Sequence, residues 1–237
     1  MSNNQSPTTN HQNALLVVAK RPAAGQTKTR LTPPLSPIQA AALYECFLGD
    51  TLDVMRQTPG VQRVVAYLPA SAEAYFATLA PDFERLVQEG HDLGERLDNA
   101  LNTYLARGYA RVAIMNSDGP NLPVHCLTAA FEGLADADVV LGPCDDGGYY
   151  LIGLKRPAPR LLREVRMSTA HVTTDTLTVA AEEGLRVTLL PIWYDVDDAE
   201  SLARLWSDLR VASATVAPRT RAFLAANLSA GLLRWGG

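Results

Sequence analysis

Cationic side chains are concentrated in the segment AKRPAAGQTKTR, residues 19–30. Two of the chain's three lysines, Lys20 and Lys28, lie in this segment together with Arg30. A guanidinium group binds phosphate oxygens through two parallel hydrogen bonds, a lysine acts as a mobile point charge, and Gly25 allows a tight turn. Residues 20–30, called the basic loop below, are therefore predicted to bind a di- or triphosphate. A solvated loop without a ligand is the alternative.

The basic loop matches neither of two common phosphate-binding motifs. The dinucleotide fingerprint needs three spaced glycines, and the P-loop needs a glycine directly before its lysine. A second segment, GHDLGERL at residues 90–97, begins a helix and could hold an anion or a base edge, although a plain turn with a helix cap explains the same residues. The further residues expected to contact a nucleotide are Thr29, Gly94 and Arg96.

Acidic side chains follow two other predicted strands. Asp118 comes directly after a strand of the buried type, and Asp197 lies in the segment DVDDAESL. If that segment is extended, Asp195 and Asp197 face the same side, while Asp198 is best placed to cap the next helix. Carboxylates hold Mg²⁺ or Mn²⁺ against phosphate oxygens. We predict that Asp118 and Asp197 share one such ion; a simple turn around Asp118 is the alternative.

Two further segments are expected to bind a second substrate, the acceptor. CDDGG at residues 144–148 lies between strand-like runs, and its Asp-Gly pair also favours a hairpin turn. Within it, Asp146 is a candidate catalytic carboxylate. In MSTAHV, residues 167–172, Ser168 is a natural N-cap, and the free N–H groups beside it could bind a carboxylate or a phosphate. The expected acceptor-binding residues are Gly147, Gly148, Tyr149, Ser168 and Thr169.

Strand-like runs alternate with helix-spaced patterns along the chain. Strands are predicted at residues 14–19, 63–68, 85–89, 111–116, 138–143, 149–154 and 186–191. Helices are predicted at residues 37–55, 71–80 and 94–108, from residue 123 onward, at 169–183 and 198–209, and over the last twenty residues. This alternation predicts a three-layer α/β fold whose mainly parallel sheet is covered on both faces. Ligands of such sheets bind beyond the carboxyl ends of the strands, where all the segments above lie.

Composition limits the class of protein. The 237 residues carry a net charge of −4, and 47% are hydrophobic, which suits one domain over residues 14–237 behind a disordered polar tail at residues 1–13. No apolar run is long enough for a membrane span, and the tail lacks the apolar core of a signal peptide. Three widely spaced cysteines suit a reducing cytoplasm. The net charge argues against nucleic acid as the main partner.

Six segments together resemble the motifs of a known family. They are AKRPAAGQTKTRL, GHDLGERL, NSDGPNLP, GPCDDGGYYLIGL, MSTAHV and DVDDAESL. In this order they are similar to the DUF2064 proteins, glycosyltransferase-like members of the nucleotide-diphospho-sugar transferase superfamily, over about residues 14–209.

The resemblance implies a GT-A (Rossmann-like) fold, shared with molybdenum-cofactor and 2-phospholactate guanylyltransferases. It also implies that the basic loop is the phosphate-binding signature loop and that Asp118 and Asp197 are the metal-binding acids. Two positions depart from the family pattern: Met167 stands where a tryptophan is common, and Ser201 stands in place of an acid.

Three functions fit these residues. In the first, slightly favoured, a small acceptor attacks the α-phosphate of an NTP, Lys28 and Arg30 stabilise the leaving pyrophosphate, and the carboxylate pair holds Mg²⁺ or Mn²⁺. In the second, the same metal site holds the diphosphate of a nucleotide-sugar and Asp146 deprotonates the acceptor. In the third, the protein binds a nucleotide or a partner without catalysis. The residues leave the nucleobase, the acceptor and the oligomeric state open.

Overall fold

A seven-stranded sheet forms the centre of the computed structural model, which describes residues 12–229. The strands lie in the order β3-β2-β1-β4-β6-β5-β7. They are β1 (Asn13–Lys20), β2 (Val61–Leu68), β3 (Glu84–Val87), β4 (Arg111–Met115), β5 (Val139–Pro143), β6 (Tyr149–Leu154) and β7 (Val187–Leu189). The predicted tail lies outside the described residues up to residue 11, and its last residue, Asn13, begins β1.

The sheet is mainly parallel, as predicted, with one exception. β1, β2, β3 and β4 run parallel, and β5 runs parallel to β7. β6 is antiparallel to both of its neighbours, β4 and β5, because the CDDGG segment turns the chain back directly after β5. The hairpin reading of this segment is therefore confirmed.

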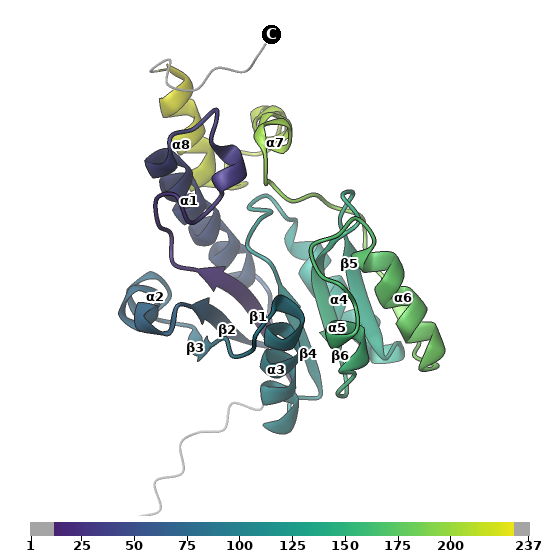
Figure 1. The fold of residues 1–237 in the computed structure, drawn as a ribbon. Helices are drawn as coiled ribbons and strands as arrows, with labels where there is room; N and C mark the ends of the chain where they lie inside the picture. Colours follow the sequence, from purple (N-terminus) through teal and green to yellow (C-terminus); the bar gives the residue numbers. More distant parts are fainter. Residues whose placement is uncertain (1–11, 230–237) are drawn as a thin grey trace, which may run out of the picture.

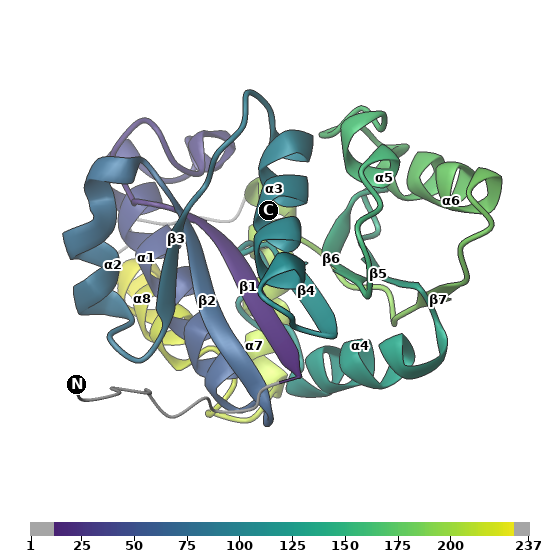
Figure 2. The ribbon, with the colours of Figure 1, turned by 90° about the horizontal axis from the view of Figure 1, so that it is seen from below.

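Helices cover both faces of the sheet, which makes three layers (Figures 1 and 2). Leu15, Val17 and Ala19 of β1 pack toward α1, α4, α7 and α8, whereas Ala14 and Leu16 pack toward α3, α5 and α6. Successive strand residues point to opposite faces, so a strand that is buried on both sides must be apolar throughout. The long helices are α1 (Pro37–Arg56), α3 (Leu93–Ala106), α4 (Val124–Asp136), α6 (Val172–Glu182), α7 (Ala199–Val211) and α8 (Pro218–Ser229). The short ones are α2 (Glu73–Leu79), α5 (Arg160–Arg163) and the 3₁₀ turns η1 (Thr29–Leu31) and η2 (Ala70–Ala72).

Two predicted helix starts are confirmed by their caps. The Ser36 side chain accepts a hydrogen bond from the Gln39 backbone N–H at 3.3 Å, and the Gln39 side chain accepts one from the Ser36 backbone N–H. Asp198 caps α7 in the same reciprocal way with Ser201 as its partner. Ser201 thus takes the position where a capping box commonly has an acid or an amide.

Most element ends differ from the prediction by one or two residues, and three differences are larger. α6 begins at Val172 and not at residue 169, β7 has only three residues, and α5 was not expected. Among the described residues, no helix combines the length and apolarity needed to cross a membrane.

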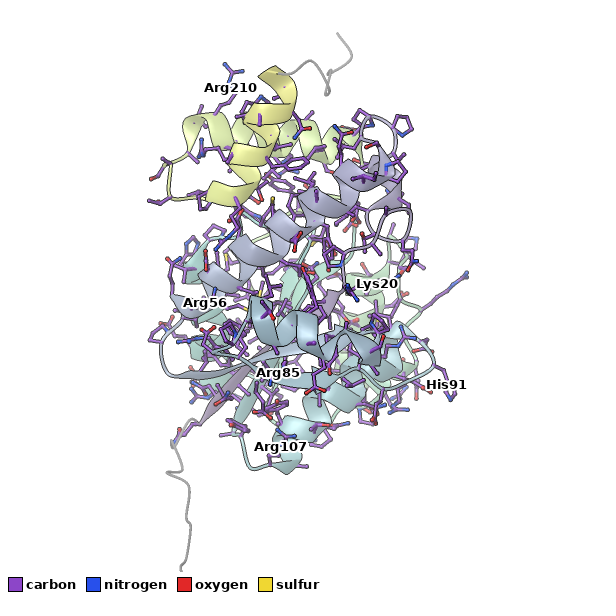
Figure 3. The ribbon with its side chains drawn as sticks, turned by 90° about the vertical axis from the view of Figure 1, so that its left-hand side faces the viewer. Lys20, Arg56, Arg85, His91, Arg107 and Arg210 are labelled. Carbon is purple, nitrogen blue, oxygen red and sulfur yellow. The ribbon has the colours of Figure 1, made fainter. Side chains whose placement is uncertain are left out.

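Helices and parallel strands run in opposite directions, so their ends separate the molecule into two sides. In Figure 3, Lys20 at the end of β1 lies on one side, and Arg56 at the end of α1 lies on the other. The side marked by Lys20 is the carboxyl edge of the sheet, where the site is expected.

The start of α8 is capped by a side chain from another helix, which gives a test of how that helix is held. Asp50 of α1 is 1% exposed and accepts hydrogen bonds from the backbone N–H groups of Arg219 (3.1 Å) and Thr220 (2.8 Å). Asp50→Ala leaves the buried Thr220 N–H without its acceptor, so it should lower the free energy of unfolding by about 1–3 kcal/mol. Urea denaturation measures this loss. The matched variant Asp53→Ala removes a half-exposed partner of Arg219 and should cost less than about 1 kcal/mol; equal losses would contradict the capping role.

Candidate active site

The ammonium group of Lys28 lies between the carboxylates of Asp118 and Asp197. Its Nζ donates to Asp197 Oδ1 and to the Val196 carbonyl, each at 2.8 Å, and it also contacts Asp118 Oδ1. The lysine side chain is only 6% exposed. The structure therefore joins the basic loop, the end of β4 and the segment before α7 through a single cation.

Burial and charge act on the pKa of Lys28 in opposite directions. Burial lowers the pKa, because an ammonium group is less stable away from water, but the carboxylates of Asp118 and Asp197 outweigh it and raise the net pKa well above the ordinary 10.5. The rings of Tyr44 and Phe47 add favourable cation–π contacts at 6.0 and 5.7 Å from Nζ. Lys28 is therefore a permanent positive charge at neutral pH.

The basic loop is held in a closed turn by its own polar groups. The buried Thr27 hydroxyl donates to the Ala23 carbonyl at 3.1 Å and accepts from the Ala23 N–H at 3.3 Å. Lys20 Nζ donates to the Gln26 carbonyl at 3.4 Å. Gly25 has a φ of +72°, and a Cβ built there would meet nothing within 4 Å, so the position requires glycine for its backbone angles.

A buried hydroxyl network fixes the loop against the sheet. The Lys20 N–H donates to the Tyr44 hydroxyl at 3.2 Å, which shares a 2.8 Å hydrogen bond with the Ser117 hydroxyl. The Ser117 hydroxyl also bonds the Val18 carbonyl at 3.0 Å. The sequence analysis missed Tyr44, because it lies within an amphipathic helix where an aromatic residue is normally explained by packing alone.

Asp195 joins the carboxylate group that was predicted for Asp118 and Asp197. Its Oδ2 accepts from Asn116 Nδ2 at 2.8 Å, while its buried Oδ1 has no hydrogen-bond partner in the described structure. Burial first, and then the charge of Asp118, raise the pKa of Asp195 to about 7. The sequence analysis placed Asp195 and Asp197 on the same side of an extended segment. It did not single out Asn116, directly after β4, which is the hydrogen-bond partner of Asp195.

Two cavities meet at these carboxylates. The loop cavity, about 290 Å³, is lined by Lys20, Gln26, Thr27, Lys28, Thr29, Arg30, Tyr44, Asp118 and Asp197. The sheet-edge cavity, about 480 Å³, extends over the carboxyl ends of β1 and β4, the start of α3, the β5–β6 turn and residues 167–172. Arg30, Asp118 and Asp197 line both. The cationic loop and the acidic residues thus form one continuous site.

The predicted acceptor segments lie together on the sheet-edge cavity. Asp146, Gly148, Tyr149, Ser168 and Thr169 line it. Gly147 does not, but its carbonyl accepts from the Thr173 N–H at 2.9 Å, and a Cβ at Gly147 would collide with the Ala170 carbonyl. The β5–β6 turn is therefore packed tightly against the start of α6.

Ser168 is not the N-cap of α6, which corrects one expectation. The cap position is His171, whose side chain makes no capping bond, and Ser168 has a φ of +61° in the loop before it. The N–H of Thr173 in the first turn is bonded by the Gly147 carbonyl. A tertiary contact has replaced the local cap, so the helix starts later than predicted.

Two predicted nucleotide contacts lie away from both cavity walls. A Cβ at Gly94 would collide with the Leu162 carbonyl, so this glycine allows α3 to approach α5 closely. The Arg96 guanidinium donates to the carbonyls of Gly90 (3.1 Å) and His91 (3.4 Å) in its own loop. Figure 3 labels His91 toward the same side of the molecule as Lys20.

The donor set suits a hard divalent cation. Asp118 and Asp197 offer carboxylate oxygens, and the ammonium group of Lys28 already lies where a cation is favoured. Among residues 12–229, no group of three or more His, Cys, Asp or Glu has the arrangement of a complete metal cage. Mg²⁺ is commonly held by only one or two carboxylates, with waters and substrate phosphates completing its coordination. The residues therefore fit Mg²⁺ or Mn²⁺ together with a polyphosphate.

The raised pKa of Lys28 predicts low chemical reactivity. Only the neutral amine reacts with acetic anhydride, and each pKa unit lowers the neutral fraction about tenfold. At pH 9, Lys28 should be acetylated at least about tenfold more slowly than the exposed Lys20 and the half-buried Lys155, measured by peptide mass spectrometry. Asp118→Asn should speed up the modification of Lys28. Equal rates for the three lysines in the unaltered protein would contradict the paired geometry.

Comparison with known proteins agrees with this geometry. A protein of Desulfovibrio desulfuricans G20, assigned as a nucleotide-diphospho-sugar transferase, superimposes with a TM-score of 0.86 at 32% identity, covering 92% of this chain and 96% of the other. The 2-phospho-L-lactate guanylyltransferase of Methanothermobacter thermautotrophicus is 29% identical over 182 residues, 75% of this chain and 78% of that enzyme.

A more distant neighbour shares the fold alone. Rv0371c of Mycobacterium tuberculosis, solved in complex with manganese, is 22% identical with a TM-score of 0.51, covering 82% of this chain and 97% of the other.

Residues 51–169 match the family described as an uncharacterized protein conserved in bacteria, DUF2064. The chain is therefore a transferase with the nucleotide-diphospho-sugar transferase fold, and it belongs to the DUF2064 family.

Proposed function

We propose that the protein is a nucleotidyltransferase, which transfers the nucleotidyl group of an NTP to a small acceptor in the presence of Mg²⁺ or Mn²⁺. One observation carries the proposal: a cavity with three cationic side chains opens onto a second cavity through the carboxylates of Asp118 and Asp197. A triphosphate needs positive charge along its length, and its metal needs carboxylates at one point. GTP is the first donor to test, because the relative from Methanothermobacter is named as a guanylyltransferase.

Each residue of the junction has a role in this reaction. Lys20, Lys28 and Arg30 hold the β- and γ-phosphates and stabilise the charge that develops on the leaving pyrophosphate. Asp118 and Asp197 hold the cation, which neutralises phosphate charge and orients the NTP when bound. Arg30 is 70% exposed and only loosely paired with Asp197 (3.9 Å) and Asp198 (3.5 Å), so it can turn toward a phosphate at little cost.

The acceptor side supplies the proton acceptor. Asp146 lines the sheet-edge cavity, and its Oδ1 is oriented by a 2.9 Å hydrogen bond from the Gly148 N–H. A carboxylate in this position takes the proton of the attacking group as the acceptor oxygen bonds to the α-phosphorus. The bond from that phosphorus to the bridging oxygen breaks, and pyrophosphate leaves toward the basic loop.

Glycosyl transfer from a nucleotide-sugar is the second candidate, and the likeness to the Desulfovibrio protein favours it. The same carboxylates would hold the cation against a diphosphate, and the sugar would extend into the sheet-edge cavity. The products distinguish the two reactions, because nucleotidyl transfer releases pyrophosphate and glycosyl transfer releases a nucleoside diphosphate. Three cations in the loop cavity favour the triphosphate donor.

Replacing Lys28 tests the assigned role of the basic loop. Lys28→Met should lower the rate of pyrophosphate release by about 10²–10³, because it removes a charge aimed at the leaving group. Lys155 follows the end of the antiparallel β6, at the edge of the sheet opposite the site. Lys155→Met should therefore have the rate of the unaltered protein. Urea denaturation of both variants separates a loss of turnover from a loss of folding.

Donor binding is measured separately by thermal shift with and without Mg²⁺ or Mn²⁺. A true donor at a hundredfold excess over its Kd should stabilise the protein by about 2.7 kcal/mol. Release of nucleoside diphosphate from nucleotide-sugars, with no pyrophosphate from any NTP, would favour the second candidate. An unchanged rate in Lys28→Met would contradict the role of Lys28.

A further inference from the structure

Negative charge dominates the sheet-edge cavity. Four carboxylates line it, from Asp118, Asp146, Asp195 and Asp197, whereas Arg30 is the one Lys, Arg or His among its described lining residues. Asp118 and Asp197 are assigned to the cation in the proposed reaction, so Asp146 and Asp195 are the carboxylates left to face the acceptor. Arg30 lies at the junction with the loop cavity and is already shared by Asp197 and Asp198. The part of the cavity remote from the junction therefore offers no cation to a bound ligand.

None of three cationic side chains near the start of α3 lines the cavity. The Arg96 guanidinium is directed at the carbonyls of its own loop. Arg163 is bonded to Asp98 and to the Asn99 side chain. Arg166 is exposed and precedes Met167, but it is not part of the cavity wall.

At two helix N-termini near the cavity, one backbone N–H group is already bonded within the protein. The first turn of α6 gives its Thr173 N–H to the Gly147 carbonyl, so this donor is occupied. The first turn of α3 already has a carboxylate, because Asp92 accepts from the Glu95 N–H at 2.8 Å. An anion would therefore have to displace the bond at Thr173, or approach the negative charge of Asp92 at the start of α3.

Apolar side chains line another part of the sheet-edge cavity. Leu93 is 39% exposed at the mouth of the cavity, and Leu97 lies one turn further along α3. The Tyr149 hydroxyl donates a hydrogen bond to the sulfur of Met167 at 3.7 Å, so this pair presents mainly carbon and sulfur to the cavity. These four side chains, Leu93, Leu97, Tyr149 and Met167, are called the apolar wall below. The apolar wall suits the carbon face of a ligand.

We propose that the acceptor is an uncharged or cationic hydroxyl compound with an apolar face, and not a phosphorylated or carboxylic acid. This inference rests on the proposed nucleotidyl transfer. The hydroxyl group of the acceptor faces the carboxylates, and the carbon face of the acceptor lies against the apolar wall. A further anionic group would lie between the α-phosphate of the donor and the carboxylates of Asp146 and Asp195, where like charges repel.

The reaction is balanced without another reactant. The hydroxyl oxygen bonds to the α-phosphorus, its proton passes to the Asp146 carboxylate and then to water, and pyrophosphate leaves. The product is a phosphodiester that joins the nucleoside monophosphate to the acceptor.

The charge class of the acceptor can be measured before the acceptor is identified. A small-molecule extract of the source cells is divided on an anion-exchange column, and each fraction is incubated with protein, Mg²⁺ and NTP labelled at the α-phosphate. Labelled product should form with the unretained fraction, which holds neutral and cationic compounds. Product formed only with the retained fraction would overturn the inference while leaving nucleotidyl transfer intact. Product from neither fraction contradicts the proposed function, and the inference is then rejected with it.

A charge placed in the wall gives a second, independent test. The probe is 2-phospho-L-lactate, the anionic compound for which the Methanothermobacter relative is named. Leu93→Arg should tighten its binding at least about tenfold, because the new guanidinium group supplies the cation that the cavity lacks. Calorimetric titration of the protein with Mg²⁺ and a non-hydrolysable NTP measures the Kd.

The matched control is Ile38→Arg, since Ile38 is 74% exposed in the first turn of α1, as Leu93 is exposed in the first turn of α3. Both variants place an arginine at a helix N-terminus, so the helix dipole lowers the stability of both by the same small amount. Ile38→Arg and Arg166→Ala should bind the probe as the unaltered protein does. Tight binding of the probe by the unaltered protein, weakened by Arg166→Ala, would overturn the inference.

Discussion

The ion-paired ammonium group of Lys28 is the interaction on which the rest of the site depends. A buried lysine without a partner would be expensive, and two carboxylates make its burial possible. Because Asp118 follows β4 and Asp197 precedes α7, the same contact holds three distant segments in place. The lysine also keeps the two carboxylates close together, although like charges would otherwise separate them.

The second half of the site depends on one reversed strand. β6 runs antiparallel to β5, so the turn that joins them lies at the same sheet edge as the basic loop. Gly147 lets this turn pack against the loop before α6, and Thr173 bonds it there. An L-residue at Gly147 would have both an unfavourable φ and a backbone collision. This wall of the sheet-edge cavity is therefore built from two segments that are adjacent only after folding.

Charge is distributed unevenly between the two cavities. The loop cavity holds the cationic side chains of Lys20, Lys28 and Arg30, and the sheet-edge cavity holds most of the carboxylates and an apolar wall. Electrostatic interactions are stronger in partly buried clefts than in water, so this division separates ligands by charge. In the proposed reaction, this division favours a polyphosphate on one side of the carboxylate junction and an acceptor on the other.

The sequence by itself determined the α/β class, most strands and helices, the caps at Ser36 and Asp198, and the segments that reach the carboxyl edge. These follow from local periodicity and from the rule that parallel strands end at one edge. Only the tertiary structure decided the strand order, the role of Tyr44 and the late start of α6. Those features depend on contacts between segments far apart in the chain: a hydroxyl bonded across two strands, and a helix N–H bonded by the carbonyl of Gly147 in place of Ser168. Spacing along a sequence carries no information about such partners, because a local pattern is compatible with many of them.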